Sequence, residues 1–117
     1  MRFKRSEKVG DMIREEVSQI LIKGLKDPRI GFVTITKVAV SDDLRMAKIY
    51  YSVFGKEKEK EESYRGLESA KGYIKRELGR RVRLKYMPEI TFIFDESLEY
   101  GSHIEELLRG LKDKEEG

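Results

Sequence analysis

Residues 32–54 read FVTITKVAVSDDLRMAKIYYSVF, and this stretch decides the fold. Its two halves, 32–40 and 46–54, are rich in β-branched and aromatic residues, which favour strands. Apolar side chains alternate along the second half and share one face: Ala47, Ile49, Tyr51 and Val53. Between the halves, Ser41-Asp42-Asp43-Leu44 supplies side-chain acceptors typical of a turn. The stretch therefore predicts an antiparallel hairpin with one apolar face.

An amphipathic helix is predicted ahead of the hairpin, over residues 6–23. Apolar residues recur there at three- and four-residue steps and form one stripe: Val9, Met12, Ile13, Val17, Ile20 and Leu21. Asp27-Pro28 interrupts the helical pattern, because proline disfavours a helical conformation in the residue before it. The helix therefore ends before the hairpin begins.

Two helices and a third strand are predicted after the hairpin. Residues 62–71 and 73–84 have helical spacing, and Gly72 between them marks an interruption or a bend. Residues 89–95 form the third strand, with Ile90, Phe92 and Phe94 on one face. The chain crosses over through helices before this strand, as a parallel pair in a mixed sheet requires.

The predicted fold class is α+β. The order is α-β-β-α-kink-α-β with a short C-terminal helix over 97–111, and the helices pack on a three-stranded mixed sheet. A chain of 117 residues has the size of one ordinary domain. We expect residues 1–112 to form that domain and residues 113–117 to be a frayed, charged C-terminal tail.

The composition argues against an enzyme. The chain has no cysteine and one histidine, His103, which leaves no thiolate nucleophile and no histidine–cysteine metal set. No glycine pattern typical of nucleotide or dinucleotide binding occurs. We therefore predict a non-enzymatic protein with no metal and no cofactor. The sequence shows no signal peptide and no apolar run long enough to span a bilayer, so a cytoplasmic protein without a membrane partner is expected.

Positive charge is concentrated in one segment. The net charge is +3, but residues 64–86 contain eight Lys or Arg against two acidic residues. Residues 87–117 contain three against nine. A local excess of positive charge attracts polyanions, so the segment predicts a phosphate-binding face. The alternative is an ordinary solvated helix face balanced by the acidic C-terminal part.

The spacing within this segment separates apolar from basic residues. One side of the predicted helix is apolar: Ile74, Leu78 and Val82. The opposite side carries three arginines at i, i+4 and i+7: Arg76, Arg80 and Arg83. Guanidinium groups bind phosphate oxygens as a fork, which suits this geometry better than lysine does. Four cations flank them: Lys71, Lys75, Arg81 and Lys85. Gly72 is predicted to admit a close backbone approach at a helix start, where free N–H groups favour an anion.

Further cations lie near the N-terminus and around Pro28. The candidates for additional phosphate contacts are Arg5, Lys8, Lys26 and Arg29. Tyr50 and Tyr73 are possible stacking partners for bases, but packing is the preferred interpretation for both.

Four segments, in order along the chain, resemble the bacterial ribosome-binding factor A family. They are Lys26 to Gly31 (KDPRIG), Val38 to Tyr50 (VAVSDDLRMAKIY), Gly72 to Leu78 (GYIKREL) and Pro88 to Asp95 (PEITFIFD). Each motif alone is weak, but together in this order they are specific. The resemblance extends from about residue 4 to residue 111.

This resemblance implies a type II KH-like fold with an Ala-x-Gly kink in place of the Gly-x-x-Gly loop of ordinary KH domains. Ala70-Lys71-Gly72 stands at the position of the kink. It also implies a monomer that binds free 30S subunits rather than 70S ribosomes or polysomes, assists late 30S assembly and 16S rRNA processing, and acts in cold adaptation. The expected partner is 16S rRNA, with its 5′-terminal helix region as one candidate.

Two other functions remain open at this point. A protein–protein adaptor would use the acidic C-terminal part and would bind its target without RNA. A general KH-type binder of single-stranded nucleic acid would bind unstructured oligonucleotides as well as subunits, although the missing Gly-x-x-Gly argues against it.

Overall fold

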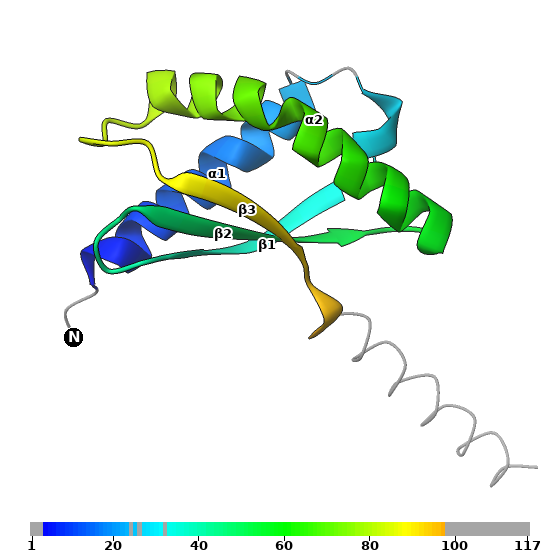
Figure 1. Ribbon diagram of the computed structural model, residues 1–117, viewed down its shortest axis with the longest axis horizontal. Coiled ribbons are helices and arrows are strands. Elements are labelled where there is room, and N and C mark those ends of the chain that lie inside the picture. The colour runs from blue at the N-terminus through cyan, green and yellow to red at the C-terminus, as the bar shows by residue number, and fades with distance from the viewer. Residues whose placement is uncertain (1–3, 24, 26, 32, 98–117) are drawn as a thin grey trace, which may run out of the picture.

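The computed structural model describes residues 4–23, 25, 27–31 and 33–97 (Figure 1). Its elements, in chain order, are α1 (Arg5–Lys23), the 3₁₀ helix η1 (Pro28–Ile30), β1 (Val33–Val40), β2 (Met46–Val53), α2 (Glu57–Arg81) and β3 (Glu89–Phe94). The last helix expected over 97–111 falls on residues outside the described part from 98 onward, and so does the tail expected at 113–117.

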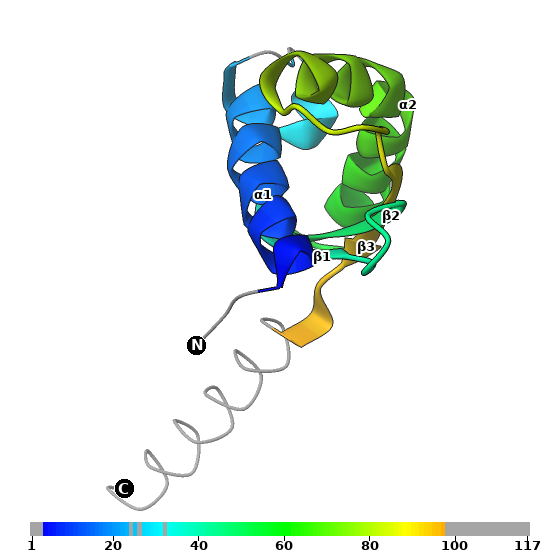
Figure 2. The same ribbon diagram turned by 90° about the vertical axis from the view of Figure 1, so that its left-hand side faces the viewer.

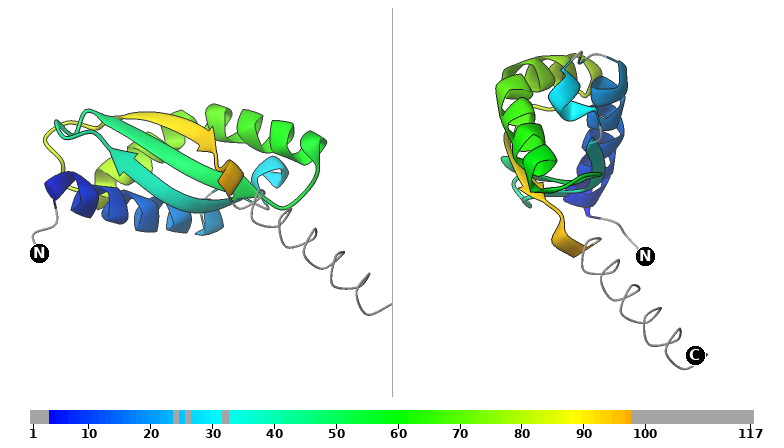
Figure 3. Two further views of the ribbon diagram at one scale, coloured as in Figure 1. Left: turned by 90° about the horizontal axis from the view of Figure 1, so that it is seen from below. Right: turned by 90° about the vertical axis from the view of Figure 1, so that its right-hand side faces the viewer.

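The three strands form one mixed sheet in the order β1-β2-β3. β1 and β2 pair antiparallel as a hairpin, and β2 and β3 pair parallel, with Ile49 opposite Phe92. Both long helices lie on the same side of the sheet (Figure 2), and the view from below shows the sheet face that they leave uncovered (Figure 3). The predicted α+β class and mixed sheet are confirmed.

The core lies between the two helices and the covered face of the sheet. α1 and α2 bury most of the apolar stripes that the spacing predicted: Val9, Ile13, Val17, Ile20, Leu67, Ile74 and Leu78. Two residues of the predicted α1 stripe differ, because Met12 is exposed and Leu21 is half-buried. The strands bury their alternating residues: Ile35, Ala47, Ile49, Tyr51, Ile90 and Phe92. Residues that recur about every 3.6 positions in the helices and every second position in the strands therefore pack together in one hydrophobic cluster.

α2 differs from the prediction at both ends and in its middle. It begins at Glu57 instead of 62, because the Lys/Glu run consists of good helix formers and the Glu59 carboxylate accepts the backbone N–H of Lys56 at 3.0 Å. It continues through Gly72 as one helix, and its ribbon changes direction near the middle (Figure 1). The predicted interruption between two helices is thus a bend within one helix. α2 ends at Arg81, because Val82 turns to an extended conformation and buries its side chain.

Two glycines set how closely the elements pack. A β-carbon on Gly10 would lie 2.7 Å from the carbonyl oxygen of Val38, so the backbone of α1 rests almost directly on β1. A β-carbon on Gly66 would lie 2.8 Å from Cγ1 of Ile30, so η1 packs equally closely on α2. These contacts hold the helix layer against the sheet and fix the position of Arg29 beside α2.

Candidate nucleic-acid interface

The C-terminal half of α2 presents a basic side to solvent. Ile74 and Leu78 are buried on the core side, whereas Arg76 and Arg80 are exposed on the opposite side. Tyr73 lies beside these arginines and is 36% exposed. The predicted separation of apolar and basic sides is confirmed over this part of the helix. We call Tyr73, Arg76 and Arg80 the basic side of α2.

Ion pairs mark the two edges of this basic side. At one edge, Lys75 Nζ lies 3.2 Å from Glu89 Oε2 at the start of β3. At the other edge, Arg81 Nη1 lies 3.4 Å from Glu16 Oε2 on α1. Because Lys75 and Arg81 are drawn toward β3 and α1, they flank the basic side instead of extending it.

Two other predicted cations also have partners on α2. Lys71 Nζ lies 3.1 Å from Glu68 Oε2 and 5.8 Å from the centroid of the Phe92 ring. Arg80 Nη1 lies 3.7 Å from Glu77 Oε1. Exposed pairs of this kind contribute only about 0–1 kcal/mol, so a phosphate can replace the carboxylate at little cost.

The structure corrects two expectations at the ends of the basic segment. Arg83 lies beyond the end of α2 at Arg81, so it does not share a helix face with Arg76 and Arg80. Gly72 lies inside a continuous helix, so no free helix start binds an anion there. A β-carbon on Gly72 would have no atom within 4 Å, which leaves the helix surface open at that point.

The other predicted cations lie on different elements. Arg5 and Lys8 are exposed on the first turns of α1. Arg29 is exposed on η1, where its Nη2 lies 2.6 Å from Asp27 Oδ2. The Arg29 side chain, by donating hydrogen bonds, lowers the pKa of the Asp27 carboxyl. Lys26 lies outside the described residues.

One end of the molecule brings together basic residues from distant segments. A cavity there is lined by two predicted residues, Arg5 and Lys85, and by Arg45 from the hairpin loop. Sequence reasoning did not select Arg45 or the neighbouring Tyr86, which is 65% exposed, and it favoured packing for Tyr73. The structure thus adds these three side chains to the candidate interface.

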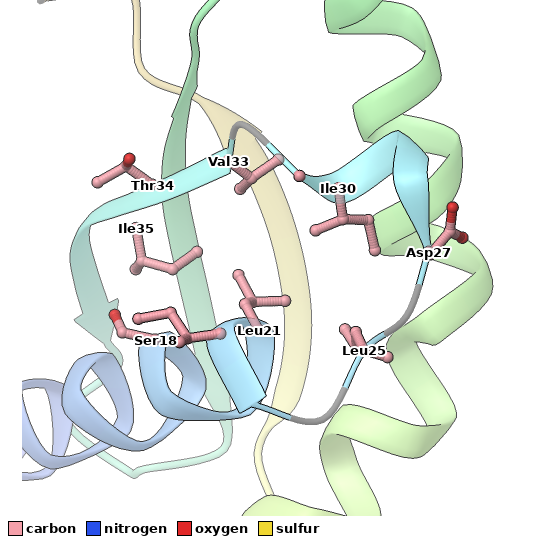
Figure 4. Close-up of a pocket in the computed structure, with 10 residues that line it drawn as sticks. Ser18, Leu21, Leu25, Asp27, Ile30, Val33, Thr34 and Ile35 are labelled. Carbon is pink, nitrogen blue, oxygen red and sulfur yellow. The ribbon is translucent and has the colours of Figure 1, made fainter.

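A cavity of about 480 Å³ lies between the end of α1, η1 and β1 (Figure 4). Its lining is mainly aliphatic and includes Leu21, Leu25 and Ile30. Two polar side chains on its wall take part in local structure: the Ser18 hydroxyl donates to the backbone oxygen of Arg14, and Asp27 pairs with Arg29. These contacts stabilise the surrounding chain.

Within the part of the chain that the structure describes, no group of three or more His, Cys, Asp or Glu side chains is placed to hold a metal ion. None of the described helices combines the length and apolarity that crossing a bilayer requires.

The chain is similar in sequence and in structure to proteins that share one name. The sequence profile described as ribosome-binding factor A matches residues 5–108. The ribosome-binding factor A of Geotalea daltonii is 54% identical over 107 residues, which cover 92% of this chain and 87% of the relative. The crystal structure of ribosome-binding factor A from Thermus thermophilus superposes with a TM-score of 0.67 at 26% identity, covering 75% of this chain and 93% of that one.

A second Thermus thermophilus structure also shares the fold. It is a homology-built ribosome binding factor A fitted into the cryo-EM map of a complex between the 30S subunit and this factor. Its TM-score is 0.64 at 24% identity, and the match covers 81% of this chain and 97% of that one. This likeness extends to nearly the whole of the Thermus chain.

Proposed function

The chain belongs to the ribosome-binding factor A family, and from this membership we propose that it binds free 30S ribosomal subunits and assists their late assembly. The proposal includes preference for free 30S over 70S ribosomes and polysomes, support of 16S rRNA processing and a role in cold adaptation. It describes a cytoplasmic monomer that acts without a cofactor and without catalysis. The Thermus relative fitted into a 30S complex supports the choice of partner.

The observation that carries the proposal is the basic side of α2 in a member of this family. Arg76 and Arg80 are exposed and lie one helical turn apart, so both guanidinium groups can reach neighbouring phosphates of one RNA strand. Lys71 and the edge residues Lys75 and Arg81 can exchange their solvent-accessible carboxylate partners for phosphate.

The remaining cations add to the same anchoring. Gly72 leaves room for close approach of an RNA backbone to the bent helix, beside Ala70 and Lys71. Further phosphate contacts are proposed for Arg83, Lys85, Arg5, Lys8, Lys26 and Arg29.

Binding then stabilises one conformation of the 16S rRNA, because a ligand shifts an equilibrium by its differential affinity for the two states. The 5′-terminal helix region of the 16S rRNA is the proposed place of contact.

Sedimentation with purified 30S subunits, 50S subunits and 70S ribosomes tests the partner. We expect co-sedimentation with 30S alone. Equal association with all three particles would overturn the proposal. A comparable affinity for an unstructured oligonucleotide would instead favour a general single-stranded nucleic-acid binder, and binding that survives nuclease treatment would favour a protein–protein adaptor.

A charge-reversal variant tests the anchoring. Arg76→Glu with Arg80→Glu should weaken 30S binding and make the plot of log affinity against log salt less steep, since fewer phosphate counterions are released. Lys58→Glu with Arg65→Glu is the matched control, because it makes the same charge change on exposed residues in the first half of α2. An equal loss in both variants would show that only net charge matters.

A further inference from the structure

The end of the molecule at which α1 begins holds a basic cavity of about 310 Å³. The start of α1, the loop between β1 and β2 and the loop between α2 and β3 lie together there (Figure 1). Each of the three segments contributes one cation to the lining: Arg5, Arg45 and Lys85. We call this cavity the end pocket.

The hairpin loop holds Arg45 in a fixed position. The Ser41 hydroxyl donates to Asp43 Oδ1 at 2.6 Å, and the same carboxylate oxygen accepts the backbone N–H of Arg45 at 3.1 Å. On the other side, the backbone oxygen of Arg45 accepts the N–H of Glu89 at 2.8 Å, which ties the loop to β3. The guanidinium group is therefore carried by a backbone that is already ordered.

Leu44 shows that this loop adopts an unusual conformation. It is the one non-glycine residue with a positive φ among the described residues, at 61°. A left-handed conformation is unfavourable for a leucine, and residues of this kind are concentrated at functional sites. The side chains of Leu44 and Leu84 both pack partly against the core and also line the end pocket. They give the end pocket an apolar floor beneath its cations.

The cations of the end pocket, like Arg76 on α2, are held by no ion pair among the described residues. In contrast, Lys75 and Arg81 each form one. Asp43 also lines the end pocket, but one of its carboxylate oxygens is bound to Ser41 and to the backbone N–H of Arg45. Three cations against one carboxylate leave an excess of positive charge in a small volume.

An aromatic ring stands at the same place. Tyr86 lines the end pocket and is 65% exposed, and Lys85 Nζ lies 5.5 Å from the centroid of its ring. Exposed aromatic rings beside cations are the usual platform for unpaired bases, because the ring stacks on a base while the cations hold the phosphate.

We propose that the end pocket binds one nucleotide of single-stranded RNA, with its phosphate held by Arg5, Arg45 and Lys85 and its base stacked on Tyr86. The choice of RNA rests on the proposed function. Lys85 follows Arg81 by four residues, so their Cα atoms are at most about 14 Å apart. An RNA strand anchored on the basic side of α2 can thus continue into the end pocket.

Two variants and one control test this inference on the full chain. Arg45→Gln with Lys85→Gln removes two of the cations, and Tyr86→Ala removes the ring. Lys48→Gln is the control, because Lys48 is an exposed cation of β2 outside the end pocket. Affinity is measured for 30S subunits and for a six-nucleotide unstructured RNA. We expect Tyr86→Ala to lose roughly tenfold in both assays. The double variant should lower the salt slope by about two, and the control should change neither.

Photo-crosslinking provides an independent readout. Irradiation of the complex should attach a nucleotide to the peptide that contains Tyr86, and Arg45→Gln with Lys85→Gln should abolish this adduct while the thermal unfolding midpoint stays unchanged. Unaltered affinity in both pocket variants, or crosslinks confined to α2, would overturn the inference. If the wild-type chain showed no preference for 30S subunits, the proposed function would fail, and the six-nucleotide RNA would still decide whether the end pocket binds a nucleotide.

Discussion

Arg81 Nη1 lies 3.4 Å from Glu16 Oε2, and this ion pair joins the last turn of α2 to the middle of α1 across 65 residues of sequence. Both side chains are about one-third exposed, so the pair is hydrated and weak. Glu16 places a negative charge directly beside the basic side of α2.

Glu16→Gln should strengthen RNA binding. The substitution keeps the shape of the side chain but removes the charge that competes with phosphate for Arg81, and an exposed pair of about 0.2–1 kcal/mol corresponds to a gain of about 1.5- to 5-fold in affinity. Titration of 30S subunits at low salt measures the change. Glu61→Gln, at an exposed position in the first half of α2, should have little effect. Weaker binding by Glu16→Gln would show that the pair orders the interface instead of competing with it.

Gly72→Ala should raise the stability of the fold and lower the affinity for 30S subunits. A β-carbon there meets no atom within 4 Å, so alanine should stabilise the fold by up to about 1 kcal/mol through its higher helix propensity. The same methyl group stands where the proposed close approach of RNA occurs, and 30S affinity should fall. Denaturant unfolding and subunit titration measure the two effects.

Gly79→Ala is the control for this substitution. Its β-carbon would lie 3.5 Å from Cε of Met87, an ordinary contact, so a similar stabilisation is expected without loss of affinity. Unchanged 30S binding by both variants would mean that RNA does not approach the helix backbone at Gly72.

Gly10→Ala should destabilise the protein. The new β-carbon would lie 2.7 Å from the backbone oxygen of Val38, and neither backbone can yield without moving α1 away from β1. Overpacking of this kind costs about 1–3 kcal/mol, which outweighs the gain in helix propensity. The denaturation midpoint should fall in Gly10→Ala and rise in Gly72→Ala. A rise in both would show that α1 has room to shift on the sheet.

The elements that the sequence predicts well are those with regular periodicity. The stripe of α1 and the alternation of Ala47, Ile49 and Tyr51 are local patterns, and their residues are buried except Met12, which is exposed, and Leu21, which is half-buried. The start of α2 is predicted only in part, because a run of alternating Lys and Glu has high helix propensity but no apolar period to mark its first helical residue. Gly72 predicts an interruption or a bend, and its neighbours in sequence do not reveal that the helix continues in a bent form.

The candidate site depends on contacts that no local pattern encodes. Arg45 follows a turn, and only the packing of α1 against β1 brings its loop to the start of α1 beside Arg5. The ion pairs of Lys75 and Arg81 depend equally on the docking of α2 between α1 and β3. Charge density alone selects the segment, but tertiary structure decides which of its cations face solvent.

Asp95 should make stability sensitive to acid. Its carboxylate accepts a hydrogen bond from the Ser97 hydroxyl and another from the hydroxyl of Thr36 on β1, whose Oγ1 lies 2.6 Å from Asp95 Oδ2. These hydrogen bonds lower the pKa of Asp95 in the folded protein. A carboxyl whose pKa is lowered by folding stabilises the protein at pH values above its unfolded-state pKa of about 4. This stabilisation is lost as the pH falls from about 5 through the pKa of the folded protein. Asp95→Asn should therefore flatten the decline of the unfolding midpoint between about pH 5 and pH 3.

Thr36→Val and Asp42→Asn sharpen the test of Asp95. Thr36→Val removes one of the two hydroxyl donors and should flatten the acid decline in part, since the Ser97 hydroxyl remains. Asp42 is an exposed turn residue outside this network, so Asp42→Asn should keep the wild-type profile. The three profiles, measured by thermal unfolding in matched buffers, should rank Asp95→Asn as flattest, then Thr36→Val, then Asp42→Asn. An Asp95→Asn profile parallel to wild type would assign the acid sensitivity to other carboxylates, such as Asp43, whose pKa the Ser41 hydroxyl also lowers.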